Sequence, residues 1–362
     1  MKSGLLLPCG AIALLFCQAC GGDKPAAPSP VPAAPVQPAA PVPAAQAQEP
    51  GKRPAAPVRV DYEMAKRLFG NDPSAPAVDN PSTPEKVALG NALYHEKHLS
   101  KNGNLSCASC HDLSNYGVDN KPTSPGSDGK NGERNTPTTY NAFRQFKQFW
   151  DGRAETIEEQ ATGPVFNPVE HGLADEAQLV AKIKEKPELV EGFKKAFPGA
   201  AEPVTAANFR NAVGAFERTL VTRSRWDDYL DGNKKALTAE EVIGLDQFIK
   251  VGCVTCHVNR TLGGHMFQKT GAVKPYTSHD TGREQVTKAE ADKFMFKVPS
   301  LLNVEKTGPY FHDGKVSTLE EVVTIMADIQ LQVTLKKEQV DSIVAFLKAL
   351  TGPLPAEFAA KK

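Results

Sequence analysis

The sequence lacks an excess of either charge, a long apolar run and any sustained strand pattern. Lysine plus arginine and aspartate plus glutamate both total 42, which argues against a basic nucleic-acid-binding surface and against an acidic disordered tail. The apolar stretch at residues 5–16 is too short to span a bilayer comfortably. No alternation of apolar and polar residues is long enough to predict a sheet, so all-β and α/β folds are disfavoured.

The N-terminal segment resembles a bacterial lipoprotein signal. A lysine precedes the apolar stretch 5–16, which has the length of a signal-peptide core. At residues 17–20, the small Ala19 would precede the cleavage point and Cys20 would become the acylated first residue. We expect residues 1–19 to be a signal peptide and the mature protein to be lipid-anchored on the periplasmic side of the bacterial envelope. The alternative is an ordinary cleaved signal peptide followed by an incidental cysteine.

Cysteine is scarce, and the seven cysteines are an odd number, which in an exported protein suggests a leftover thiol. The positions leave none over. Cys9 and Cys17 would leave with the signal peptide, Cys20 would carry lipid, and the other four stand in two Cys-x-x-Cys-His motifs. We therefore expect no disulfide, although the compartment is oxidising.

Beyond the signal segment, residues 20–60 are rich in proline, alanine, valine and glutamine, which predicts an extended tether without a core. After them, apolar residues recur at helical spacing, and helix-capping patterns at residues 83–85 and 238–241 lead into the two motifs. The sequence therefore predicts an all-α fold with one domain over residues 61–225 and a second over 226–362.

Both Cys-x-x-Cys-His motifs have the spacing of a c-type haem attachment site. The two thiols reach the two vinyl groups of one porphyrin, and the adjacent imidazole becomes the proximal iron ligand. A zinc site would need a second ligand pair near each motif, and a redox dithiol would leave both histidines unexplained. We therefore predict two covalently bound haem c groups. The residues concerned are Cys107, Cys110 and His111 in the first half and Cys253, Cys256 and His257 in the second.

The sixth ligand of each iron separates an electron carrier from a haem enzyme. The second half offers Met266, Met295 and Met326, and helical periodicity alone selects none of them. The first half holds only Met64 and a few histidines outside its motif. We therefore expect an open, five-coordinate iron in the first half, which is what peroxide requires.

Several further stretches resemble, in order, the signatures of the bacterial di-haem cytochrome c peroxidase family. The likeness runs from about Pro84 to Gly352. It implies an all-α structure in which two cytochrome c-like haem domains pack around an inter-domain interface. The stretches are residues 105–111, 117–120, 134–138, 149–154, 309–316 and 325–326.

The resemblance implies a division of labour between the haems. The haem on His111 would be peroxidatic, and the haem on His257, with Met326 as sixth ligand, would receive electrons from a small periplasmic cytochrome c or cupredoxin. Trp150 would lie between them. The implied reaction is the reduction of hydrogen peroxide to water, in a monomer or a homodimer.

The resemblance also places Glu170 and Gln160 in the distal pocket of the first haem. A carboxylate there can move a proton from one peroxide oxygen to the other. It further implies a calcium ion bound by Asn135 and by backbone oxygens of Thr307 and Pro309. Taken singly, each of these residues also has an ordinary structural explanation, such as a solvated loop acid or a turn asparagine. Found together in family order, they favour function.

Two residues depart from the family pattern. Ser127 stands where many members carry a histidine that caps the resting peroxidatic haem, so the first haem is expected to turn over without reductive activation. His98 or a rearranged loop is the alternative cap. His171 follows Glu170 where methionine is usual; either it alters the pH dependence of the proton-transfer step or it is a helix-start residue without a role.

Two other functions compete with the peroxidase. A di-haem oxidase of the methylamine-utilisation type would act on a protein substrate, and Met326 argues against it because that subclass uses tyrosine as the corresponding ligand. A non-enzymatic electron carrier or redox sensor would need both irons six-coordinate. Glu170 and Gln160 argue against it, because a carrier needs no distal proton chemistry.

Overall fold

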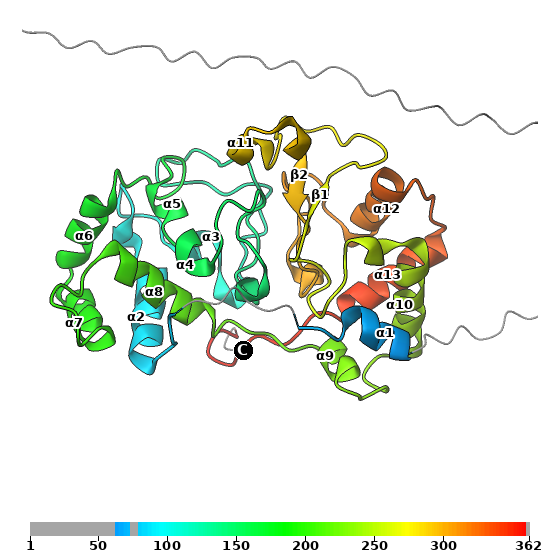
Figure 1. The fold of residues 1–362 in the computed structure, drawn as a ribbon, viewed down its shortest axis with the longest axis horizontal. Coiled ribbons are helices and arrows are strands. Elements are labelled where there is room, and N and C mark those ends of the chain that lie inside the picture. The colour runs from blue at the N-terminus through cyan, green and yellow to red at the C-terminus, as the bar shows by residue number, and fades with distance from the viewer. Residues whose placement is uncertain (1–61, 73–78, 360–362) are drawn as a thin grey trace, which may run out of the picture. The chain divides into compact units, whose positions relative to one another are not determined.

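Helices make up most of the regular structure in both halves of the fold (Figure 1). The computed structural model describes residues 62–72 and 79–359. The predicted signal peptide (1–19), the lipidation site Cys20 and the tether (20–60) lie outside the described residues. None of the described helices is long and apolar enough to cross a membrane.

The described elements confirm the predicted all-α fold. In the first half they are α2 (Pro84–His95), α3 (Cys107–Cys110), α4 (Ile157–Gln160), α5 (Gly163–Phe166), α6 (Glu176–Lys184), α7 (Pro187–Ala196) and α8 (Ala206–Glu217). In the second half they are α9 (Arg225–Leu230), α10 (Ala239–Val251), α11 (Glu284–Thr287), α12 (Leu319–Leu331) and α13 (Lys337–Lys348), and α1 (Tyr62–Phe69) packs with them. Within the described ranges, the only sheet is the antiparallel pair β1 (Phe267–Lys269) and β2 (Met295–Lys297).

Helices α2 and α10 precede the two motifs, and capping residues in the sequence account for where they start and for where α10 ends. The side chain of Thr83 caps α2, and Thr238 and Glu241 form a reciprocal capping box at the start of α10. Gly252 ends α10 in the left-handed region, with φ 106°, immediately before Cys253. Each motif is therefore positioned by a capped helix.

Each of these two helices crosses a later helix at a glycine. A methyl group at Gly90 on α2 would lie 2.0 Å from the carbonyl oxygen of Ala212 on α8. A methyl group at Gly244 on α10 would lie 1.8 Å from the carbonyl oxygen of Ser342 on α13. Because neither glycine has a side chain, both backbone pairs approach closely, and the two halves share one plan.

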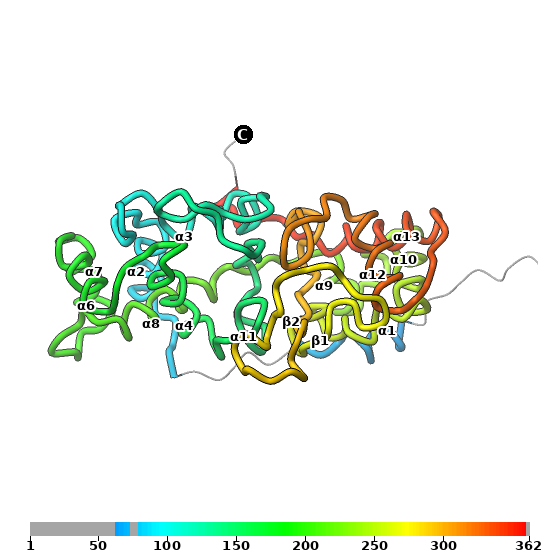
Figure 2. Tube along the Cα trace, turned by 90° about the horizontal axis from the view of Figure 1, so that it is seen from above, coloured from blue at the N-terminus to red at the C-terminus, as the bar shows by residue number. Residues whose placement is uncertain are grey.

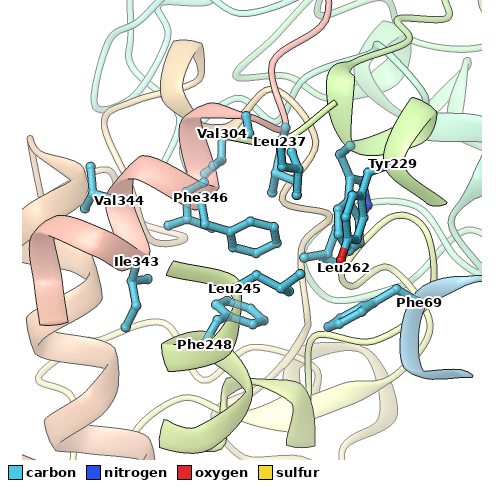
Figure 3. Close-up of a cluster of buried hydrophobic side chains, with 14 of the residues drawn as sticks. Phe69, Tyr229, Leu237, Leu245, Phe248, Leu262, Val304, Ile343, Val344 and Phe346 are labelled. Atoms are coloured by element: carbon cyan, nitrogen blue, oxygen red, sulfur yellow. The ribbon is translucent and has the colours of Figure 1, made fainter. Parts of the chain in front are cut away.

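The core of the second half gathers α1, α9, α10 and α13 around aromatic side chains (Figure 3). Phe69 of α1 packs edge-on against Trp226 of α9, with 5.2 Å between ring centroids. Trp226 packs in turn against Phe346 of α13 at 5.4 Å. The views in Figures 1 and 2 both place α1 beside α10. Helix α1 thus joins the second core although it lies in the first predicted domain; the division at 225/226 stays a prediction.

The first half has its own apolar core, built mainly from α2, α6, α7 and α8. Beside it, a smaller cluster contains Phe216 of α8, and Phe358 from the C-terminal segment packs edge-on against that ring at 6.2 Å. The chain therefore crosses between the halves near both of its ends.

Candidate haem sites

The four cysteines of the motifs are half-buried, and none of them forms a disulfide. Burial raises the pKa of the Cys107 and Cys253 thiols to about 12 each. A redox-active Cys-x-x-Cys pair needs the opposite shift, because the thiolate is the reactive species. The surroundings of the motifs therefore argue against a dithiol redox centre.

The two motif histidines are held in the same way. The Nδ1 atom of His111 lies 3.2 Å from the carbonyl oxygen of Gly117, and Nδ1 of His257 lies 2.7 Å from that of Leu262. Iron-ligating histidines in proteins typically donate this second ring nitrogen to such an acceptor, which leaves Nε2 for the metal. Burial lowers the pKa of both rings, that of His257 to about 4, which favours the neutral ligand form. Both sites thus fit a haem iron.

A large apolar cavity adjoins the second motif, with about 1720 Å³ of empty space that is partly open to solvent. Its lining includes Cys253, Cys256, His257 and Met326. Met266 and Met295 are not in the lining, so the structure separates the three methionines that periodicity left equivalent. Apolar walls contributed by α10, α12 and α13 suit a porphyrin face.

The first motif has a half-buried carboxyl group nearby. The charge of Glu170 acts on both Cys107 and Cys110, and Asn167 donates a 2.9 Å hydrogen bond to its Oε1 atom. Burial raises the pKa of Glu170, and the charge of Arg153 opposes that shift. Such a carboxyl group is partly protonated closer to neutral pH than an exposed one.

The other predicted distal residues differ in how firmly they are held. Gln160 is half-buried at the end of α4. His171 is buried, and its Nδ1 atom lies 2.9 Å from the carbonyl oxygen of Leu99. Burial lowers the pKa of His171, so its neutral form is favoured.

Ser127 is buried within a hydrogen-bonded loop. Its hydroxyl group donates to Oδ1 of Asn104 over 2.8 Å, and its backbone N–H donates to the carbonyl oxygen of Glu170 over 2.8 Å. The alternative cap His98 has its Nε2 atom 2.7 Å from a carboxylate oxygen of Glu185. The ring of His98 is therefore paired with the exposed carboxylate of Glu185.

A segment of the first half connects the two sites. The backbone of Pro137 acts on His111 and opposes the lowering of its pKa by burial, while residues 135–138 also line the second cavity. Trp150 lines this cavity too, and its Nε1 atom donates to the carbonyl oxygen of Asn135 over 2.9 Å. Trp150 therefore stands beside the segment that touches both motifs.

The residues expected to bind calcium all line the same large cavity. Asn135, Thr307 and Pro309 all contribute to its lining. The Nδ2 atom of Asn135 donates to the carbonyl oxygen of Lys121 over 2.9 Å, which leaves its Oδ1 atom as the acceptor. No group of three or more histidine, cysteine or acidic side chains that could hold a metal occurs in the described part of the chain. The available donors are neutral oxygens, which calcium accepts.

Two buried ionisable residues escaped the sequence analysis. Lys297 lines the second cavity, and its only signal was a lone lysine between Phe296 and Val298. Glu217 is buried on α8 close enough to Cys107 for its charge to act on that thiol. Its signal was a helical spacing that put an acid on the apolar face of α8.

Comparisons with known proteins point in the same direction as the geometry. Residues 84–235 match the family model described as di-haem cytochrome c peroxidase. The chain is 43% identical to the cytochrome c551 peroxidase of Nitrosomonas europaea, over 81% of this chain and 88% of that protein. It is 37% identical to the cytochrome c551 peroxidase of Pseudomonas aeruginosa, over 83% and 89% respectively. Among solved structures, a MauG-like protein associated with microbial copper homeostasis is similar, with a TM-score of 0.71 and 30% identity over 80% of this chain and 95% of that chain.

Proposed function

Because the chain belongs to the di-haem cytochrome c peroxidase family, we propose that electrons from a small donor protein enter at the haem on His257 and reduce hydrogen peroxide at the haem on His111. The chain is a peroxidase with two covalently bound haem c groups. The donor is a cytochrome c or a cupredoxin.

One observation carries this assignment: the two motifs have different surroundings. The second motif shares its cavity with Met326, a thioether that suits a six-coordinate electron-transfer haem. The first motif has the half-buried carboxyl group of Glu170 nearby. Proton-transfer chemistry is useful only where peroxide is cleaved, so the asymmetry supports a relay haem and a working haem.

Glu170 is the proton-transfer group of the reaction. When bound, the haem supplies the iron and the electrons that cleave the O–O bond. Glu170 takes a proton from one peroxide oxygen and returns it to the other, and its raised pKa suits both steps. The hydrogen bond from Asn167 orients the carboxyl group. By the family resemblance, Gln160 would supply a second polar side chain on the distal side of the first haem.

Trp150 carries electrons between the two sites. Its indole ring lines the second cavity, and its hydrogen bond to Asn135 fixes it against the 135–138 segment. The Lys297 N–H donates to the Trp150 carbonyl oxygen over 2.7 Å, which anchors the tryptophan to the second half as well. An aromatic residue whose side chain is held by the first half and whose backbone is held by the second is a suitable bridge.

The first haem would be five-coordinate in the oxidised enzyme, because Ser127 stands where the family resemblance places a capping histidine. The hydroxyl group of Ser127 is hydrogen-bonded to Asn104, and its backbone N–H is hydrogen-bonded to the carbonyl oxygen of Glu170. Turnover then requires no prior reduction of the second haem.

Calcium binds at the interface of the two halves, through Oδ1 of Asn135 and the carbonyl oxygens of Thr307 and Pro309. The hydrogen bond from Nδ2 of Asn135 to Lys121 supports this orientation of the amide. Treatment with a chelator, followed by calcium addition, tests the site through calcium content and haem spectra.

The enzyme acts on the periplasmic side, tethered by acylated Cys20.

Mixing the protein with hydrogen peroxide and a reduced small cytochrome c tests the proposed function. We expect rapid oxidation of two donor molecules for each peroxide consumed. If the donor is not oxidised although both haems can still be reduced and reoxidised, the protein is an electron carrier. Consumption of peroxide with modification of a protein substrate, and without donor oxidation, would identify an oxidase instead.

A further inference from the structure

A buried lysine lines the cavity of the second motif. Lys297 is the last residue of β2, lies opposite Phe267 on β1 and is 7% exposed. It lines the cavity together with Cys253 and Cys256. No function proposed so far uses this side chain.

The ammonium group of Lys297 has a neutral partner only. Its Nζ atom donates to Oε1 of Gln145, which is itself buried and lines the same cavity. No salt bridge within the described residues includes Lys297, and burial lowers its pKa to about 7 without any opposing charge. A buried cation beside a single amide is unfavourable, because buried charges require a counter-charge.

The cofactor itself provides that counter-charge. Haem c carries two propionate groups, and they are the anionic substituents of the porphyrin. We propose that Lys297, together with Gln145, binds a propionate of the haem attached at Cys253 and Cys256. The inference rests on the second haem of the proposed function and assigns these two residues to it.

The charge of Lys297 has a consequence for the iron. A nearby cation stabilises the reduced haem, which is one charge less positive than the oxidised haem. Lys297 therefore raises the reduction potential of the electron-accepting haem. Because its backbone N–H also holds Trp150, it couples the propionate contact to the bridge between the haems.

The experiment compares the holoprotein with Lys297→Met, Lys297→Arg and the control Lys269→Met. Lys269 is an exposed lysine on β1 that does not line the cavity. Potentiometric titration followed by visible spectra gives the midpoint of the second haem. Redox-difference infrared spectra, with haem labelled by ¹³C at the propionate carboxylates, report the contact directly.

We expect Lys297→Met to shift the reduction equilibrium at least roughly tenfold towards the oxidised haem, which is about 59 mV for one electron. The labelled propionate band should shift as well. Lys297→Arg should recover at least part of both effects, and Lys269→Met should match the native protein. A Lys297→Met protein with two haems per chain, a native midpoint and an unchanged propionate band overturns the proposal.

If Lys297→Met fails to retain the second haem, Lys297→Gln, which keeps a hydrogen-bond donor without the charge, is judged by the same two criteria. Loss of the methionine-to-iron absorption band in a variant whose propionate band is native would identify Lys297 as a structural support of Met326 and also overturns the proposal. Both measurements are made without peroxide. A protein that is inactive towards peroxide therefore still gives a result for Lys297.

Discussion

The backbone N–H of Ser127 donates a 2.8 Å hydrogen bond to the carbonyl oxygen of Glu170. This bond joins the loop of Ser127 to the segment that carries Glu170, the proposed proton-transfer group. The Ser127 hydroxyl group points to Asn104 in the same network. The loop and the acid therefore form one connected structure beside the first motif.

The first prediction concerns the resting state. On the proposed coordination, in which no side chain caps the first iron, the oxidised protein should contain one high-spin and one low-spin haem. Paramagnetic resonance of the oxidised enzyme measures both populations. Ser127→His should convert the high-spin signal to low-spin, whereas Ser127→Ala should leave it. A native spectrum with two low-spin haems would contradict the prediction.

Replacement of Glu170 by glutamine should slow the reaction with peroxide. The amide keeps the shape of the side chain but cannot transfer a proton, so kcat/KM for peroxide should fall by about 10²- to 10⁴-fold. Stopped-flow mixing with peroxide measures the rate. Glu188→Gln, at an exposed position on α7, is the matched control. A loss of less than roughly tenfold would remove Glu170 from the proton-transfer role.

His171→Met tests whether the unusual neighbour of Glu170 affects the pH profile. Burial lowers the pKa of His171, so the ring is neutral at neutral pH and gains a proton only below its ordinary range. The native rate should then fall on the acidic side as His171 becomes charged, and the variant should lack this contribution. Peroxidase rate against pH is the measurement. An identical profile for both proteins would mean that His171 has no part in the step.

The buried acid Glu217 should make stability depend on pH. Burial raises its pKa from 4.5 to about 8, so the folded chain retains a proton that the unfolded chain has released in this window. Stability should therefore fall as pH rises from about 4.5 to 8, by about 1.4 kcal/mol per unit. Glu217→Gln should flatten this slope in denaturant titrations. Glu240→Gln, at an exposed site, should retain it.

The crossing of α10 and α13 should not tolerate a side chain at Gly244. A methyl group there would lie 1.8 Å from a carbonyl oxygen, so Gly244→Ala should lower the free energy of unfolding by about 1–3 kcal/mol or more. Denaturant unfolding of the holoprotein measures the loss. Gly199→Ala, where a methyl group meets nothing within 4 Å, should cost far less. Equal stabilities of the two variants would show that the helices can separate without cost.

The local features of the fold were predictable from the residues. Thr83, Thr238 and Glu241 cap the helices that they were expected to cap, because capping depends on a few neighbouring residues. The two haem attachment sites are likewise predicted by local sequence, since their thiols and imidazole are held together by spacing along the chain. The all-α class followed from the same helical periodicity.

The sequence by itself thus predicted the two haem attachment motifs and the helical segments, since both depend on short-range chemistry. Only the tertiary structure decided which methionine shares the second cavity, because Met266, Met295 and Met326 have equivalent chemistry and differ only in position. It also decided that Lys297 is buried. Burial and charge pairing arise from residues far apart in the chain, so no local pattern encodes them.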